Sequence, residues 1–524
     1  MKLTDKEIKS ASHNKADARP ARTVFVMMSI MVIGKAMGLL RDRMQGLTFG
    51  INTTEAVAFA QASALPRNFL DIMFAAALSS SFIPVFSGYL EKKGKREAFD
   101  LASLFVSVTL VITTLVTVVA VIFAAPIYDL FAGSEYEIRL LGIELLRYML
   151  PLMILSGLAF SFTGILQSLG EFRLPAAMSV VSNGVILFYY FFLVDRFGVH
   201  GLAVAFLVGW AMQALIQIPW LIRHKFRFKF KLDFSNSGLR EIGALTIPVL
   251  AASWLLPVNS LVNLRAVRGL YGGYYGAPGL QLAFSLFTVV SGVFILSVSN
   301  VIFPKLSRQS AILDGEGFRT SLGETVRVMF FFLIPLTFGM MALSQPLVRL
   351  VYYGQNFCER SVEITARALY FMSIGIVGYG MQVVLSRACF AQKDGRTPLV
   401  ATVVGIGVNA VLSFTLLRFE IAGPAIAGAV GISLSALVMV VMLTLKGQLA
   451  WPTQLVVDLA KMLVLAVIMF FVVRFVHGWL IYSHAFFQVL ILAAVGAGVY
   501  IGGCALLGMK ELKWVLSLLK PNTK

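Results

Sequence analysis

Residues 101–125 read LASLFVSVTLVITTLVTVVAVIFAA, a run of 25 residues without a charged side chain. As a helix, this run is long enough to cross the roughly 30 Å hydrocarbon layer of a bilayer. Similar apolar runs recur about fourteen times along the chain, as at residues 399–417 and 485–508. The sequence therefore predicts an all-α polytopic membrane protein with about fourteen transmembrane helices.

The expected spans follow one another with short connections. They are residues 23–40, 56–88, 101–125, 143–168, 174–194, 200–222, 241–268, 278–303, 324–345, 366–391, 398–417, 422–445, 455–475 and 485–508. The second span is too long for one straight crossing and contains Pro66 and Pro84. We expect it to be kinked or broken, because proline cannot donate a helical hydrogen bond.

The composition agrees with a membrane protein, since 58% of residues are hydrophobic and 13% are charged. The net charge of +18 is unevenly distributed, because basic residues crowd every second connection, as at 92–96, 223–231 and 393–396. Intervening connections such as 129–137 are poorer in basic residues or acidic. This alternation follows the positive-inside rule and predicts an even number of spans with both termini in the cytoplasm. We expect the stretch 223–231 to meet membrane lipid headgroups, and no nucleic acid.

The chain also repeats itself. Residues 201–215 read GLAVAFLVGWAMQAL and residues 423–437 read GPAIAGAVGISLSAL, an offset of 222. Arg173-Leu-Pro175 returns as Arg396-Thr-Pro398 at an offset of 223, and Pro84-Val-Phe-Ser87 returns as Pro304-Lys-Leu-Ser307 at an offset of 220. The offset corresponds to six spans, an even number, so the repeats should run parallel. The sequence thus predicts two parallel six-helix pseudo-repeats plus two C-terminal helices.

This organisation gives six expected regions. They are a basic cytoplasmic tail (1–22), an N-terminal six-helix bundle (23–222), a basic cytoplasmic linker (223–240), a C-terminal six-helix bundle (241–446), two additional helices (447–508) and a cytoplasmic tail (509–524). Gly-rich stretches such as 405–407 and 423–431 are typical of closely packed membrane helices.

Several cations lie inside or at the ends of the apolar runs, where a charge costs at least about 2.5–3.5 kcal/mol. They are Lys35, Arg41 beside Asp42, Arg67, Arg265 and Arg268. Two alternatives stay open: arginines near span ends can extend to the interface, and Arg67 can pair with Asp71 four residues later. Since few anionic side chains accompany these cations, the sequence predicts a cationic cavity that suits a phosphate-bearing substrate.

No pattern for chemistry competes with this hypothesis. The five histidines lie in tails or connections, the three cysteines lie far apart, and there is no Gly-Lys-Ser/Thr phosphate loop. We therefore expect no catalytic residues, no metal site and no cofactor. A membrane-embedded lipid-modifying enzyme and a non-transporting scaffold remain minor alternatives.

Ordered short motifs along the whole chain resemble one family. They are Gly38-Leu-Leu-Arg-Asp42, Ala77-Leu-Ser-Ser-Ser-Phe-Ile-Pro-Val-Phe-Ser87, the segment 164–176 with Asn183, Gly209 with Gln213, Gln217 and Pro219, and Tyr353-Gly354 through Thr397-Pro398. Together they are similar to the bacterial lipid II flippases of the MurJ/MviN family, in the multidrug/oligosaccharidyl-lipid/polysaccharide exporter superfamily.

The resemblance implies a flippase in the bacterial inner membrane. Such a protein moves undecaprenyl-pyrophosphate-linked peptidoglycan precursor, lipid II, from the inner to the outer leaflet by alternating access. It also implies that cations of spans 1, 2 and 8 bind the pyrophosphate and that the last two spans form a groove for the lipid tail. Cell-wall synthases are candidate partners. By position, Lys35 and Arg41 match the family's cations of span 1.

Two positions depart from the family pattern. The family's span 2 arginine falls on Leu70, although Arg67 lies one turn earlier, and its span 8 arginine falls on Ser285. We therefore expect Lys35, Arg41, Arg67 and Arg265 to bind the pyrophosphate, with Asp42, Arg268 and Ser285 as additional site residues. The departures leave an exporter of another polyprenyl-linked oligosaccharide, of the O-antigen or capsule type, as the alternative. A drug/cation antiporter is a weaker one, because few buried acidic residues are expected.

Overall fold

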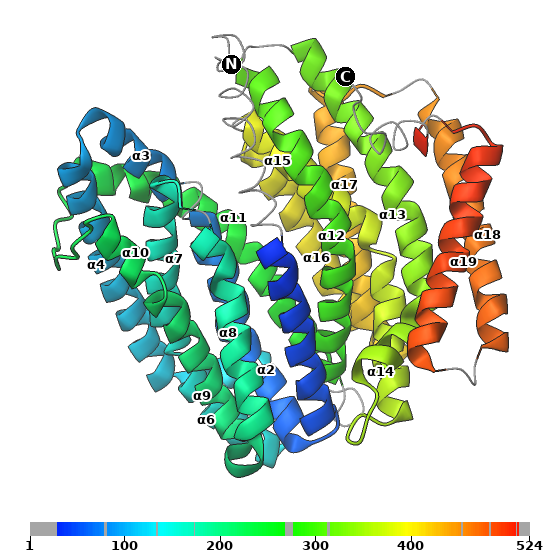
Figure 1. Cartoon of the computed structure of the whole chain (residues 1–524), viewed down its shortest axis with the longest axis horizontal. Coiled ribbons are helices and arrows are strands. Elements are labelled where there is room, and N and C mark those ends of the chain that lie inside the picture. Colours follow the sequence, from blue (N-terminus) through cyan, green and yellow to red (C-terminus); the bar gives the residue numbers. More distant parts are fainter. Residues whose placement is uncertain are drawn as a thin grey trace, which may run out of the picture. The chain divides into compact units, whose positions relative to one another are not determined.

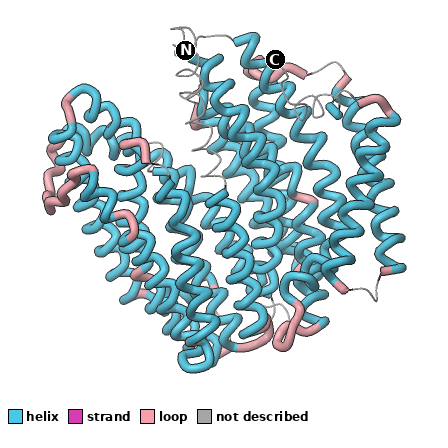
Figure 2. Tube along the Cα trace, in the orientation of Figure 1, coloured by secondary structure: helices cyan, strands magenta, loops and turns pink. Residues whose placement is uncertain are grey.

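The computed structural model describes residues 29–77, 81–132, 135–171, 173–267, 276–311, 315–392, 394–451, 454–480, 484–509 and 511–512. Within helices, it does not describe the side chains of residues 68–77, 247–260, 293, 296–305, 307, 308, 310 and 311. Most of both expected tails and all of Arg268 lie outside the described residues. The described part is built of helices joined by short loops and contains no strand (Figure 2). The predicted all-α fold is confirmed.

The described residues form two compact units. Residues up to 45, 61–130 and 139–257 belong to the first unit, and residues 46–60, 131–138 and those from 258 onward belong to the second. The first unit holds most of a helix over residues 29–49, most of α2 (Thr54–Ala77), α3 (Ile83–Lys92), α4 (Lys95–Ile122), most of α5 (Ala124–Phe131), most of α6 (Tyr136–Met149), α7 (Leu152–Ser168), α8 (Arg173–Phe192), α9 (Val194–Leu215), α10 (Ile218–Arg223) and the first part of α11 (Ser237–Val267).

The second unit contains the remaining helices (Figure 1). They are the end of α11, α12 (Gly276–Ala311), α13 (Gly315–Tyr352), α14 (Glu359–Ser373), α15 (Ile376–Ala391), α16 (Arg396–Thr415), the 3-10 turn η3 (Leu417–Phe419), α17 (Ala422–Leu445), α18 (Leu455–Trp479) and α19 (Ala485–Leu506).

Helices occupy the positions of the expected spans, but the exact count of fourteen is not confirmed. Among the described residues, nine helices are long and apolar enough to cross a membrane, or ten if the pair α14 and α15, bent by 50°, is one span. In the second expected span, Pro66 lies inside the continuous helix α2, and Pro84 lies in the first turn of α3. Residues 78–80, between these helices, are outside the described part.

The internal repeat is also present in the backbone. α8 and α16 each have 20 residues, and they begin at Arg173 and Arg396, an offset of 223. A kink follows each helix: Gly198 has φ 52° and ψ −144°, and Glu420, 222 residues later, has φ 57° and ψ −137°. Such positive φ values are uncommon outside glycine. Their recurrence supports two copies of one folding pattern.

Small residues bring α16 and α17 together, as the glycine-rich stretches predict. A Cβ atom added to Gly405 would lie 2.6 Å from the carbonyl oxygen of Gly431, and one added to Gly431 would lie 2.6 Å from that of Gly405. Only residues without a side chain allow this approach of two backbones. Gly407 differs, because nothing lies within 4 Å of its Cβ position.

In the second unit, α13 packs beside α18 and α19 (Figure 1). Their shared core includes Phe331, Met462, Met469 and Tyr500. Beside this core, Arg327 of α13 pairs with Asp458 of α18 at 2.6 Å and with Glu511. Ionic and apolar contacts therefore both hold the C-terminal helices to α13.

Asp394 fixes the turn before α16. Its carboxylate accepts hydrogen bonds from the backbone N–H groups of Arg396 (3.1 Å) and Thr397 (3.2 Å), and from Lys446 Nζ at 2.5 Å. Burial of Asp394 disfavours its charge, but the hydrogen bonds from Lys446 and Thr397 outweigh this effect and lower its pKa from 3.8 to about 2. The ionised carboxylate thus links the start of α16 to the end of α17.

We expect Asp394→Asn to lower the melting temperature at neutral pH. A carboxyl whose folded-state pKa is depressed adds stability above its unfolded pKa, and this stability is lost as pH falls toward the folded pKa. The deficit of the variant should therefore be constant above about pH 4.5 and shrink toward about pH 2. Thermal unfolding of both proteins in detergent across this range is the measurement. A deficit independent of pH would show that the charge of Asp394 is not responsible.

Candidate functional site

Arg41 is held in place by its neighbours in the first unit. On the helix over residues 29–49, its Nη2 atom lies 2.7 Å from Asp42 Oδ1, and its Nη1 atom donates to Asn183 Oδ1 of α8 at 3.0 Å. The amide of Asn183 in turn donates to the carbonyl of Gly34 at 3.2 Å. Asp42 is buried, and the Arg41 side chain is only 15% exposed. The guanidinium is therefore oriented before any ligand binds.

A second arginine shares an aromatic contact with the first. The guanidinium carbon of Arg41 lies 5.7 Å from the ring centroid of Phe206 of α9, and that of Arg67 of α2 lies 5.4 Å from the same ring. A cation over an aromatic face is attracted by the ring's quadrupole. Three helices thus bring two permanently charged groups to one buried ring.

Tyr190 of α8 adds a polar group to this site. Its side chain is only 3% exposed, and it lies within electrostatic reach of Arg41, Asp42 and Arg67. Its hydroxyl has no hydrogen-bond partner among the described residues. Because a buried hydroxyl without a partner is costly, Tyr190 is an unsatisfied hydrogen-bonding group in the site.

The arrangement suits an anion with several oxygens. Arg41, Arg67 and Asp42 sum to one positive charge, and guanidinium groups match phosphate oxygens through paired N–H donors. No set of three His, Cys, Asp or Glu side chains that could hold a metal ion occurs in the described part of the chain.

The structure brings together only some of the predicted site residues. Arg41, Asp42 and Arg67 lie together, whereas Lys35 is exposed and no described residue pairs with it. Arg265 is exposed at the end of α11, and Ser285 of α12 is half-buried; both belong to the second unit. The Arg67–Asp71 alternative stays open, because the Asp71 side chain is outside the described part.

The second unit contains an amide bridge near the positions related to Arg41. The repeat offsets of 220–223 relate Arg41 to residues 261–264 of α11, a stretch that includes Asn263. Asn263 Oδ1 accepts hydrogen bonds from Asn409 (2.9 Å) and Ser413 (3.1 Å) of α16. In the second unit, a neutral amide bridge therefore joins α11 to α16.

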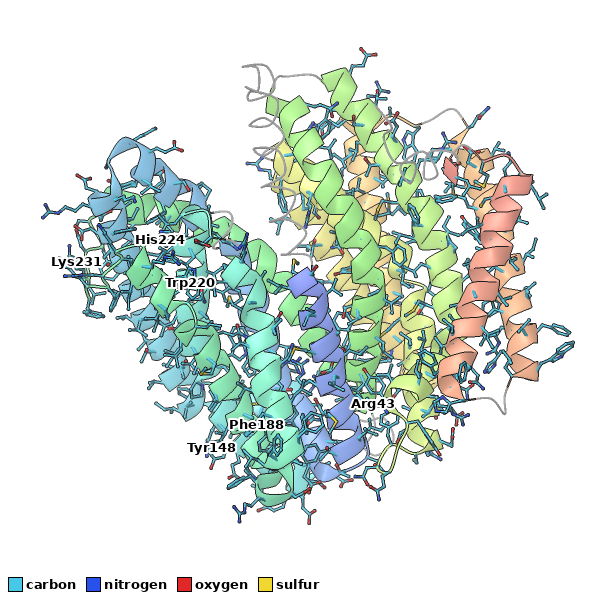
Figure 3. All side chains as sticks on the ribbon, viewed as in Figure 1. Arg43, Tyr148, Phe188, Trp220, His224 and Lys231 are labelled. Carbon is cyan, nitrogen blue, oxygen red and sulfur yellow. The ribbon has the colours of Figure 1, made fainter. Side chains whose placement is uncertain are left out.

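Asn183, Phe206 and Tyr190 are the site residues that sequence reasoning missed. Asn183 carries a signal, because a buried amide inside an apolar run needs a partner. Phe206 carries none, since the chain has 42 phenylalanines. Figure 3 labels Arg43, which follows Asp42 in the sequence, at the same end of the first unit as Tyr148 and Phe188. His224 and Lys231 lie toward the other end of this unit.

The chain is similar to one family of known proteins. The profile of the family described as "Lipid II flippase MurJ" matches residues 47–496. A probable lipid II flippase MurJ of Treponema pallidum (strain Nichols) is 27% identical over 437 residues, which is 81% of each chain. The lipid II flippase MurJ of Thermosipho africanus (strain TCF52B) is 26% identical over 404 residues, 76% of this chain and 81% of the relative.

Two solved structures share the fold. The structure titled "Lipid II flippase MurJ, inward closed conformation" covers 95% of this chain and all of its own, with a TM-score of 0.79 and 23% identity. An inward-facing multidrug resistance MATE family transporter of the MOP superfamily covers 80% of this chain and 97% of its own, with a TM-score of 0.70 and 16% identity. Residues 29–46, which include Arg41, precede the stretch that the family profile matches.

Proposed function

Because this chain belongs to the lipid II flippase MurJ family, we propose that Arg41 and Arg67 bind the diphosphate of lipid II while the protein moves this lipid between the leaflets of the inner membrane. The observation that carries the proposal is the contact of both guanidinium groups with the ring of Phe206. A diphosphate is the charged group that links the lipid to its sugar headgroup, and it is the part of lipid II that these arginines can recognise.

The surroundings of the two arginines favour an anion over a cation. Charge interactions strengthen where water is excluded, and Phe206 and Tyr190 are both almost fully buried. The hydroxyl of Tyr190 can donate a hydrogen bond to a phosphate oxygen. Among the described side chains, Asp42 is the anion beside Arg41 and Arg67, so the two guanidinium groups disfavour an organic cation there.

The family consists of transporters, and we propose that this chain performs translocation by alternating access with no chemical step. We propose a membrane topology in which both termini and the basic stretch 223–231 face the cytoplasm, following the positive-inside rule. Lys35 and Arg265 would then assist the diphosphate at other points of its passage. We also propose that the chain is organised in the six regions expected from the sequence. We further propose that it associates with cell-wall synthases.

Binding to the purified protein in nanodiscs tests the proposal. Lipid II and undecaprenol, which has the same tail without the diphosphate and the sugar headgroup, would be titrated into the wild type and into Arg41→Gln and Arg67→Gln. We expect each substitution to weaken binding of lipid II and to leave that of undecaprenol unchanged. Equal binding of lipid II by all three proteins would contradict the assignment of these arginines.

Asn183→Leu tests the orientation of Arg41 separately. The substitution removes the acceptor of the 3.0 Å hydrogen bond from Arg41 Nη1. Hydrogen bonds to charged groups contribute about 1.5–3 kcal/mol, so we expect lipid II binding to fall by roughly 10- to 100-fold. Ser182→Ala is the matched control, because Ser182 is also buried in α8 and, among the residues that the structure describes, its hydroxyl bonds only to the carbonyl of Ser179. Equal losses in both variants would point to a general disturbance of α8.

A further inference from the structure

The segment between α10 and α11 is an extended strap, defined here as residues 226–234, which lies against α4 (Figure 1). The backbone N–H of Lys229 donates to Ser103 Oγ at 3.5 Å, and that of Lys231 donates to Ser107 Oγ at 3.1 Å. Ser103 and Ser107 are one turn apart on α4, so the strap follows this helix.

Both a buried ring and an ion pair fix the strap. At its start, Phe226 is only 4% exposed and contacts Phe99 of α4 edge to face, with ring centroids 5.5 Å apart. Farther along, Lys231 Nζ lies 3.2 Å from Asp100 Oδ1. These contacts hold the strap against α4 on the surface of the first unit.

The outer surface of the strap is both apolar and basic. Its large exposed side chains are Phe228 (45%), Phe230 (58%), Leu232 (47%) and Phe234 (64%). The exposed cations Arg227 and Lys229 alternate with them, and Arg223 and Lys225 precede the strap. A segment in contact with water alone would not expose four large apolar side chains in a stretch of seven residues.

The strap ends where the apolar surface of α4 begins. Ser107, which accepts from Lys231, lies one turn before Val111, and Val111, Ile112 and Leu115 are exposed. In a bilayer, these α4 side chains face the hydrocarbon. The strap therefore lies at the level of the headgroups, where amphipathic segments with basic and aromatic side chains bind.

We propose that the strap binds the anionic phospholipid headgroups of the leaflet at this end of the first unit. Arg227 and Lys229 supply the charge that attracts these headgroups, and the phenylalanine rings enter the adjacent acyl region. A soluble acidic protein fits less well, because the depth of the strap along α4 places its aromatic side chains against lipid. The proposal concerns a lipid contact away from the arginine site and does not depend on the transported substrate.

An environment-sensitive fluorophore on the strap tests this. The full chain carrying Cys358→Ser and Phe230→Cys would be labelled with a nitrobenzoxadiazole probe; Cys358 is the exposed cysteine among the three, and Cys389 and Cys504 are buried. In nanodiscs containing phosphatidylglycerol, we expect emission at shorter wavelengths and quenching by lipid-borne nitroxides. In phosphatidylcholine alone, both effects should decrease. Raising the salt from about 0.1 M to about 1 M should weaken them, because the Debye length falls from about 10 Å to about 3 Å.

Charge variants distinguish an effect of the cations of the strap from an effect of the protein's overall positive charge. Arg227→Gln with Lys229→Gln should abolish the dependence on phosphatidylglycerol. Lys92→Gln with Lys95→Gln removes the same charge from exposed positions outside the strap and should preserve it. Emission typical of water in both kinds of nanodisc would overturn the proposal in favour of a protein partner. A blue-shifted emission that is the same in both lipids and in all variants would also overturn it, because charge would then play no part.

Discussion

Arg41→Glu should abolish the ability of this protein to support growth when a host's own lipid II flippase is depleted. The substitution removes one of two guanidinium groups at Phe206 and places a carboxylate beside the buried Asp42. Truncating one partner of a buried, hydrogen-bonded charge pair costs about 2–5 kcal/mol, so diphosphate binding should fall by at least about 30-fold. Growth after depletion, with the amount of protein in the membrane measured in parallel, is the readout.

Arg418→Glu is the matched control for this experiment. Arg418 is an exposed arginine that also contacts a phenylalanine, since its guanidinium lies 4.9 Å from the ring centroid of Phe419. The same charge reversal there should leave growth unchanged. Normal growth with well-expressed Arg41→Glu would remove this residue from the substrate site.

The largest effect on stability is expected from Arg327→Ala. Arg327 pairs with both Asp458 and Glu511, whose side chains are 10% and 4% exposed, so its removal leaves two buried carboxylates without their cation. Breaking a buried ion pair in this way costs about 3–5 kcal/mol. We expect a markedly lower melting temperature, together with faster proteolysis in the α18–α19 region. Thermal unfolding in detergent and limited proteolysis of the same samples measure both effects.

Two further variants test whether the unpaired charges cause the expected loss of stability. Arg319→Ala changes an exposed arginine of the same helix and should have little effect. Adding Asp458→Asn and Glu511→Gln to Arg327→Ala removes the unpaired charges, so it should restore part of the lost stability. A melting temperature unchanged by Arg327→Ala would show that apolar packing alone holds the C-terminal helices.

The helices were largely predictable from the sequence, because lipid selects long apolar runs regardless of their neighbours. The repeat was predictable as well, since the kinks at Gly198 and Glu420 follow the offset that the glycine-rich motifs define. The number of spans was harder to predict: nine helices of the described part qualify by length and composition, and α14 and α15 divide a further apolar run at a bend of 50°. Hydropathy alone does not reveal such a break.

The site was predictable only in part. Charges inside apolar runs pointed to Arg41 and Arg67, since buried cations are rarely tolerated without a function. The same reasoning points to Lys35, but six residues on an α-helix turn it about 120° away from Arg41. Phe206 could not be predicted, because its role depends on three helices meeting at one ring. Contacts between distant segments of this kind require the folded structure.

The most direct test of the proposed function is the appearance of lipid II in the outer leaflet of cells that depend on this protein. Cells depleted of their own lipid II flippase would express the wild type, Arg41→Glu or Arg418→Glu, and outer-leaflet lipid II would be measured by its accessibility to an externally added enzyme that cleaves it. We predict exposure with the wild type and Arg418→Glu, and none with Arg41→Glu. No exposure with a wild type that is present in the membrane, or equal exposure with all three, would contradict the account.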